Sequence, residues 1–172
     1  MDSYQDDLEI PLQNLPDIDV RVIFLVRDVR SWVYSRARDA RKKGKLMPSI
    51  RSLARWCWVN RRFERDLRRS GKPIFPLGYE EFALSPERAL SSLCDWLGLD
   101  FAPLMLSPGI STRSHILSGN RMQFDPSKNR EIRYNTSWLQ GPAWPAQPAL
   151  MLPGVGRLNQ RLVYSNKLLG GD

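Results

Sequence analysis

The most regular apolar pattern in the chain is an uninterrupted run, VIFLV, that stops at Arg27-Asp28. A run of this length without polar alternation predicts a parallel strand buried on both faces, here residues 21–26. A helical pattern follows at once over residues 29–43, and Asp28 is a favourable N-cap for it. The pattern therefore predicts a strand that leads directly into a helix, with Arg27 at the junction.

The rest of the chain alternates between helical and extended patterns in the same way. The predicted elements are a helix over 48–70, a short strand over 72–79, a helix over 86–97, a short helix starting within 135–139, and an amphipathic helix over 157–169. Ser85 is a typical N-cap, and Pro86 a typical first residue, for the helix over 86–97. The prolines of the strand over 72–79 suit a strand at the edge of a sheet. Strands alternating with helices predict an α/β fold with a parallel sheet.

The predicted helix over 48–70 carries its apolar residues at helical intervals. Its predicted core face is Ile50, Leu53, Cys57, Phe63 and Leu67, with Trp56 and Trp58 beside it. Arginines occupy the remaining faces. They suit either a solvated surface or an electropositive wall for an anionic ligand. The aromatic residues between them also suit stacking on nucleic acid, although their helical spacing favours core packing.

Composition places the chain among globular proteins of one domain. It has 172 residues, of which 42% are hydrophobic. No apolar run is long enough to span a membrane, and the polar, acidic N-terminus lacks the features of a signal peptide. These observations favour the cytoplasm, although the compartment stays open. Cys57 and Cys94 suit buried free thiols, so we expect neither a disulfide nor a metal site.

The net charge of +8 implies anionic partners. Nucleotides, sulfated or phosphorylated substrates, nucleic acids and membrane surfaces all belong to this class. The positive charge is concentrated in residues 36–72, where only Asp39, Glu64 and Asp66 are acidic. Charge alone does not choose among these partners.

The junction after the first strand is a candidate anion site. Ligands of open α/β sheets bind at the carboxyl ends of strands, and helix N-termini favour anions. Ser31 and Ser35 follow Asp28 at helical spacing, so the three share one helix face. Arg27, the helix start and the two hydroxyls therefore predict a phosphate cradle. The alternative is a structural salt bridge between Arg27 and Asp28.

Three segments resemble the sulfotransferase superfamily, whose members use 3′-phosphoadenylyl sulfate (PAPS). The first is VRVIFLVRDVRSWVYSR. In this family an arginine at a strand end and a serine eight residues later hold the 3′-phosphate of PAPS or of its product PAP. The resemblance assigns these roles to Arg27 and Ser35. It also implies a three-layer, P-loop-like parallel sheet flanked by helices.

The second segment runs from Leu77-Gly78-Tyr79-Glu80-Glu81-Phe82 to the sequence around Trp96, and it implies that Tyr79 contacts the adenine. Glu80 and Glu81 are interpreted as structural, because neighbours on a strand point to opposite faces. The third segment is similar to the family's loop over the cofactor, and it implies contacts from Gly119, Asn120 and Arg121. This chain has Ser-Gly-Asn-Arg there instead of Arg-Lys-Gly. The neighbouring His115 is interpreted as a loop residue and not as a catalytic base.

The resemblance covers residues 20–138 and lacks the family's early glycine-rich loop, which cradles the 5′-phosphosulfate. We therefore expect a leader over 1–19, a partial sulfotransferase domain, incomplete at its N-terminus, over 20–140, and a proline-rich segment with a C-terminal helix over 141–172. A truncated product, one part of a split assembly and a degenerate relative are the open explanations. A sheet without its central strand exposes apolar edge, which predicts oligomerisation or poor solubility.

The resemblance implies transfer of a sulfuryl group from PAPS to a hydroxyl or amine of a small molecule or glycan, and the basic residues suit an anionic acceptor. This chain supplies the half of the site that binds the 3′-phosphate, and no catalytic residue is assigned. The alternative is a non-catalytic basic module that binds a nucleotide, RNA or a glycan. Nucleic acid is not favoured as a partner, and no metal is implied.

Overall fold

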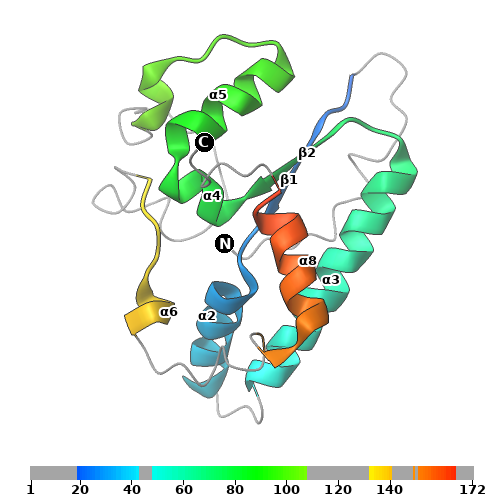
Figure 1. Cartoon of the computed structure of the whole chain (residues 1–172), viewed down its shortest axis with the longest axis vertical. Helices are drawn as coiled ribbons and strands as arrows, with labels where there is room; N and C mark the ends of the chain where they lie inside the picture. The colour runs from blue at the N-terminus through cyan, green and yellow to red at the C-terminus, as the bar shows by residue number, and fades with distance from the viewer. Residues whose placement is uncertain (1–18, 43–47, 108–131, 141–148, 150, 166–172) are drawn as a thin grey trace.

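The computed structural model describes residues 19–42, 48–107, 132–140, 149 and 151–165 (Figure 1). Its elements, in chain order, are β1 (Val22–Val26), α2 (Val29–Lys42), α3 (Pro48–Ser70), β2 (Ile74–Gly78), α4 (Tyr79–Leu84), α5 (Pro86–Leu97), the 3-10 helix η1 (Pro103–Leu106), α6 (Ser137–Gln140) and α8 (Pro153–Val163). Helices α2 and α3 connect the two strands. The order strand, helices, strand agrees with the pattern predicted from the sequence.

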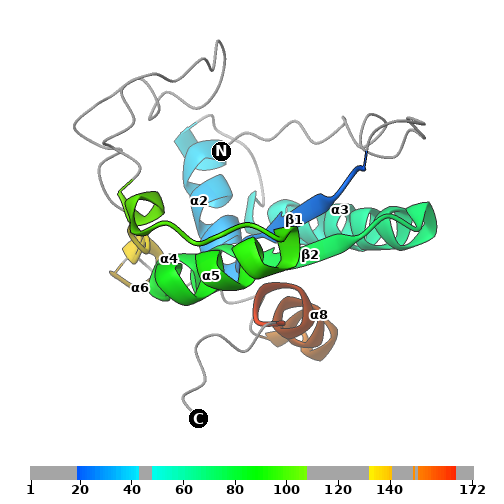
Figure 2. The same ribbon diagram turned by 90° about the horizontal axis from the view of Figure 1, so that it is seen from above.

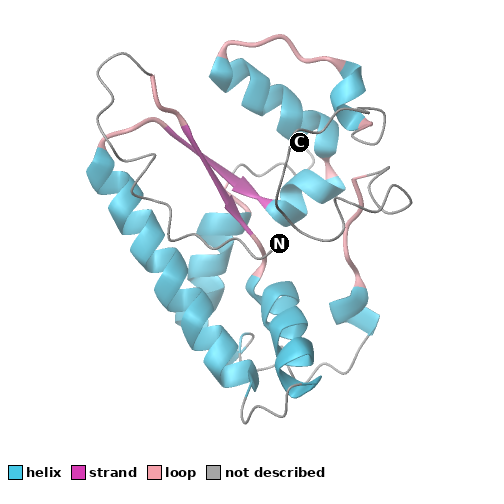
Figure 3. Cartoon of the chain, turned by 180° about the vertical axis from the view of Figure 1, so that it is seen from behind, coloured by secondary structure: helices cyan, strands magenta, loops and turns pink. Residues whose placement is uncertain are grey.

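The two strands lie side by side and parallel (Figure 3). Val22 is opposite Ile74 and Val26 is opposite Gly78. The predicted parallel pairing is confirmed, but the prediction that the first strand is buried on both faces is wrong. Ile23 is 45% exposed, and only Val26 of β1 is fully buried. Among the described residues the sheet has two strands, so its helices cover β1 only in part.

The two faces of the sheet pack against different helices, because side chains alternate along a strand. On one face, Leu25, Phe75 and Leu77 pack with Ala89 of α5. On the other face, Phe24 and Val26 join the larger core with α2, α3 and α8. Figures 1 and 2 show α8 close to the strands and α3 along one flank of the molecule. The sheet is therefore flanked by helices on both faces.

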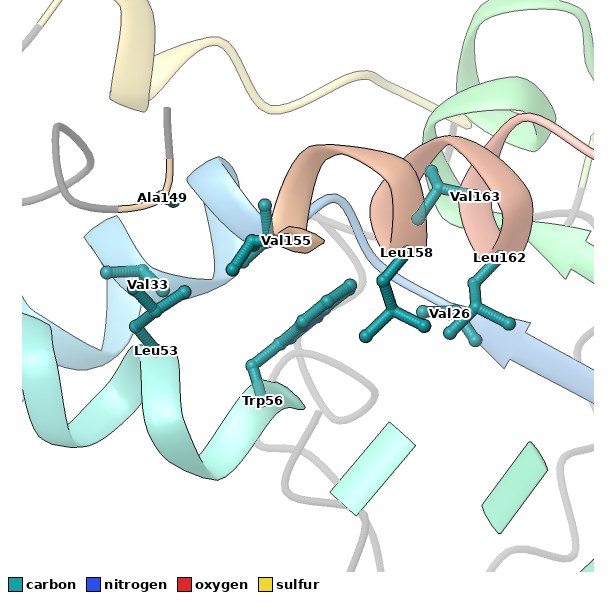
Figure 4. Packing of buried hydrophobic residues seen from close by; sticks show 10 residues of the cluster. Val26, Val33, Leu53, Trp56, Ala149, Val155, Leu158, Leu162 and Val163 are labelled. Carbon is teal, nitrogen blue, oxygen red and sulfur yellow. The ribbon is translucent and has the colours of Figure 1, made fainter. Parts of the chain in front are cut away.

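The larger core is built from segments that are far apart in the sequence (Figure 4). Val33 of α2, Leu53 and Trp56 of α3, and Leu158 of α8 are all buried in it. The predicted C-terminal helix is confirmed, but its bounds are earlier than expected. It starts at Pro153 because proline fits the first helical turn, where its missing N–H costs nothing.

The core face of α3 differs from the predicted one. Trp56, expected beside the core, is buried, whereas Ile50, expected in the core, is 56% exposed. Leu53, Phe63 and Leu67 are buried as predicted. The reason is that α3 packs on α2 and α8 with the stripe containing Trp56, and this choice turns Ile50 outward.

The segment after β2 is also corrected. Tyr79, Glu80 and Glu81 were expected on or just after a strand, but they form the first turn of α4. The next helix, α5, has Ser85 at its N-cap position and Pro86 as its first residue, but the Ser85 side chain makes no capping hydrogen bond. The helix ends at Gly98, whose φ of 72° is the left-handed conformation that glycine adopts readily. Local start and stop signals thus placed α5 correctly.

The fold class is α/β, with a small parallel sheet between helices. The full three-layer P-loop-like sheet and the domain boundaries stay predictions. Within the described ranges, no helix is long and apolar enough to cross a membrane.

Candidate anion-binding site

Arg27 follows β1 directly and is held from three sides. Its Nε donates to Ser31 Oγ at 2.9 Å, and its guanidinium carbon lies 5.4 Å from the centre of the Tyr79 ring. Its carbonyl oxygen accepts a 3.0 Å bond from Trp56 Nε1. Neither terminal nitrogen of Arg27 donates to another described residue. The side chain is therefore oriented, while its two terminal nitrogens, which can act as a bidentate donor pair, have no acceptor among the described residues.

These donors face a shallow hollow at the start of α2. It is lined by Arg27, Ser31, Tyr34, Ser35, Arg38, Asn135, Ser137 and Trp138, and it is partly open to solvent. The structure thus brings Arg27, Ser31 and Ser35 to one hollow. Two arginines and several hydroxyls are donors suited to a phosphate.

The amides at the start of α2, expected to be part of the phosphate cradle, are already satisfied inside the protein. Asp28 N donates to Glu80 Oε2 at 2.7 Å, and Val29 N donates to Asn159 Oδ1 at 2.8 Å. Arg30 N donates to Asp28 Oδ1 at 2.7 Å, which confirms Asp28 as the N-cap. The expectation that this helix start binds an anion is corrected, because these three donors have acceptors. The donors that face the hollow are therefore side chains and not these backbone amides.

Asp28 is the centre of a buried network. Its carboxylate accepts from Arg30 NH2 at 2.6 Å, from Asn159 Nδ2 at 3.0 Å and from the Tyr164 hydroxyl at 2.8 Å. The alternative of an Arg27–Asp28 salt bridge is wrong, since Asp28 pairs with Arg30. Burial alone would raise the pKa of Asp28, but the bonds from Arg30 and Asn159 hold it below its ordinary value. Burial and the nearby Asp28 charge raise the pKa of Tyr164.

Glu80 is a second buried carboxylate beside this network. Its Oε1 accepts from Ser31 Oγ at 2.8 Å, and its Oε2 accepts the Asp28 amide. Burial raises the pKa of Glu80, and these two bonds only partly offset that effect. Ser31 therefore links Glu80 to Arg27, because the same hydroxyl accepts from Arg27 and donates to Glu80. Glu80 is thus structural, as expected from the sequence, but it lies on α4 and not on a strand.

A short segment, 132–140, forms the far wall of the hollow. The Tyr79 hydroxyl donates to the carbonyl oxygen of Arg133 at 3.3 Å, and the Arg30 guanidinium lies 4.8 Å from the Trp138 ring centre. Trp138 Nε1 donates to the Tyr134 hydroxyl at 2.8 Å. Tyr79, expected at the adenine, thus contacts both Arg27 and this wall.

Several predicted residues fall outside the described part of the chain. Gly119, Asn120 and Arg121 are among them, as is His115. Cys57 and Cys94 are free thiols, and burial raises the pKa of Cys57. Among the described residues, no three metal-ligating side chains are grouped together.

Sequence reasoning missed Arg30, Asn159 and Tyr164. The contact of Arg30 with Asp28 had a local signal in the sequence, because Arg30 lies two residues after the N-cap aspartate. Asn159 and Tyr164 had none, because they meet Asp28 only through the packing of α8, 131 and 136 residues away.

Known proteins and protein families show which family the chain is similar to. No curated protein and no solved structure matches the chain. A model of the sulfotransferase family matches residues 4–103, which is more than half of the chain. This range contains β1 to α5, and with them Arg27, Ser35 and Tyr79, but it ends before Gly119. The chain belongs to the sulfotransferase family.

Proposed function

We propose that the hollow at the start of α2 binds the 3′-phosphate of PAPS or PAP, and that the chain takes part in sulfuryl transfer to a hydroxyl or amine. The observation that carries this proposal is the state of Arg27. Ser31 and Tyr79 hold its guanidinium, while its terminal nitrogens have no described partner and lie with Ser35 in one hollow. A preoriented arginine loses little entropy when it binds a phosphate.

The residues present fit such a ligand. Arg27 offers a bidentate donor pair, and Ser35 adds a hydroxyl from the next turn of the helix. PAPS, when bound, supplies the activated sulfuryl group. The part of this chain is to hold the 3′-phosphate, which orients the donor nucleotide for the transfer. The leaving charge develops on the 5′-phosphate, and no described residue is assigned to it.

Calorimetric titration of adenosine 3′,5′-bisphosphate tests the proposal. Arg27→Ala removes charge-assisted bonds worth about 1.5–3 kcal/mol, so we expect Kd to rise about ten- to a hundredfold. Ser35→Ala removes one neutral donor, and a rise of roughly two- to tenfold is expected. Arg88→Ala, an exposed arginine on α5, is the matched control and should bind as the wild type does.

Adenosine 5′-monophosphate separates the 3′-phosphate from the rest of the nucleotide. Arg27→Ala should leave its affinity unchanged, since this ligand lacks the group that Arg27 holds. Equal binding of the bisphosphate by wild type and Arg27→Ala, or no binding by either, contradicts the site. Preference for long RNA with a steep salt dependence would support the non-catalytic basic module instead.

A further inference from the structure

The outward face of α3 carries an unusual set of exposed side chains. Its exposed members are Ile50, Arg51, Ala54, Arg55, Trp58, Arg61, Arg62, Arg65, Arg68 and Arg69. We refer to these residues as the α3 outer face. At about 100° per residue they fall within one arc of the helix. Trp58 is at the centre of that arc, roughly 180° around from the buried Leu67.

This face lies on the side of α3 opposite to the anion site. The inner side of the helix points toward Arg27, since Trp56 Nε1 donates to the Arg27 carbonyl. The Arg51–Arg69 row extends for about 27 Å along the helix at 1.5 Å per residue. Figure 1 shows α3 along the flank of the molecule. The α3 outer face is therefore separate from the proposed PAPS site, and its role does not depend on that proposal.

The face combines positive charge with large apolar side chains in water. It contains seven arginines, and the acidic residues of α3 flank it: Asp66 pairs with Arg62 at 3.5 Å, and Glu64 pairs with Arg68 at 3.0 Å. Trp58 is 62% exposed and has the Arg62 guanidinium 5.6 Å from its ring centre. Ile50 is also more than half exposed. A partner must therefore be both anionic and able to bury apolar groups.

We infer that the α3 outer face binds the surface of an anionic phospholipid bilayer. Each arginine near such a surface is attracted to its phosphate and carboxylate groups. Trp58 and Ile50 gain by leaving water for the boundary between headgroups and acyl chains, where tryptophan is favoured. A straight helix on the flank of a protein can contact a plane along its whole length. A soluble polyanion such as RNA would satisfy the arginines but would leave Ile50 in water.

Co-sedimentation of the full chain with vesicles tests this inference. Wild type should bind vesicles of phosphatidylcholine containing phosphatidylserine and should not bind vesicles of phosphatidylcholine alone. The double variant Arg51→Glu/Arg55→Glu should bind the anionic vesicles at least about tenfold more weakly. Arg88→Glu/Arg157→Glu makes the same change in net charge on α5 and α8, and should stay within about twofold of wild type. Equal loss in both double variants means that net charge alone binds, and overturns the assignment to α3.

A second pair of variants tests the apolar part. Ile50→Ser/Trp58→Ser should weaken vesicle binding about tenfold while retaining all seven arginines. Leu84→Ser/Leu104→Ser removes two exposed apolar side chains that lie outside α3, and this variant should bind as wild type does. Far-UV circular dichroism and melting of each variant confirm that folding is retained. Wild-type vesicle binding by Ile50→Ser/Trp58→Ser, together with binding of RNA or heparin that depends on Arg51 and Arg55, identifies a polyanion site and overturns the lipid assignment.

Discussion

Two buried carboxylates near Arg27 behave in opposite ways because their partners differ. Asp28 receives a guanidinium, an amide and a hydroxyl, and its pKa is lowered even though burial favours the neutral form. Glu80 receives one backbone amide and one hydroxyl, and burial raises its pKa. The charged arginine decides the difference, because it favours the ionised form of its partner.

This difference predicts a distinct pH dependence for Glu80→Gln. A raised pKa in the folded state contributes stability below the unfolded pKa, near 4.5, and this stability is lost as pH rises through the folded pKa. Glu80→Gln removes that loss. We therefore expect the unfolding free energy at about pH 7, relative to that at about pH 4.5, to be higher in the variant than in wild type. Denaturant titration at the two pH values measures it.

The control is Glu87→Gln, an exposed carboxylate on α5, which should follow the wild-type pH dependence. Asp28 affects stability in a different pH range. Its lowered pKa stabilises the folded state above about pH 4, and this stabilisation is lost only as the pH falls further. Identical slopes for wild type and Glu80→Gln would show that burial does not perturb this carboxyl.

At the scale of elements, α8 packs against both the start of α2 and the end of β2. Asn159 caps the Val29 amide and also reaches Asp28. Arg161 pairs with Glu64 of α3 at 2.9 Å. The end of α8 approaches β2 so closely that a Cβ on Gly78 would lie 1.7 Å from the Val163 carbonyl oxygen. Helix α8 thus supports the anion site without lining the hollow.

Gly78→Ala should therefore destabilise the protein. The clash is with backbone, so β2 or α8 must move, and we expect a loss of about 2–4 kcal/mol of unfolding free energy. Gly156→Ala is the matched control within α8, because a Cβ there meets nothing within 4 Å. It should be neutral or stabilise the helix by about 0.5–1 kcal/mol. Urea unfolding compares the two, and equal stabilities would contradict the close approach.

For the whole molecule, the strand edges and the positive charge have opposite effects on association between chains. Among the described strands, β1 pairs only with β2, and Ile23 on β1 is almost half exposed. Unpaired strand edges with apolar side chains favour pairing between chains, whereas a net charge of +8 opposes it.

We expect the attraction between unpaired strand edges to outweigh charge repulsion between chains once salt screens the charge. Light scattering at high protein concentration should then show oligomers that increase with ionic strength. A monomer under all of these conditions would contradict the prediction. Ile23→Lys, which places a charge on the strand, should reduce the oligomers, because natural edge strands avoid pairing in this way.

The sequence by itself determined the elements that carry local signals, and it singled out Arg27 as a candidate site residue. The strand before Arg27, the Asp28 N-cap, and the start of α5 at Pro86 and its end at Gly98 are confirmed, whereas burial of that strand on both faces is not. The helical spacing of Ser31 and Ser35 put them on one face of the helix, and both line one hollow with Arg27. These features depend on interactions within a few residues, so a local pattern is enough to reveal them.

Only the tertiary structure decided which apolar stripe of α3 is buried, that Tyr79 begins a helix, and that Asn159 and Tyr164 complete the Asp28 network. It also showed that the amides at the start of α2 are satisfied internally and that Ser31 orients Arg27. These contacts join residues on separate elements. Their energy depends on how α8, α4 and α2 pack together, and no pattern within a single segment contains that information.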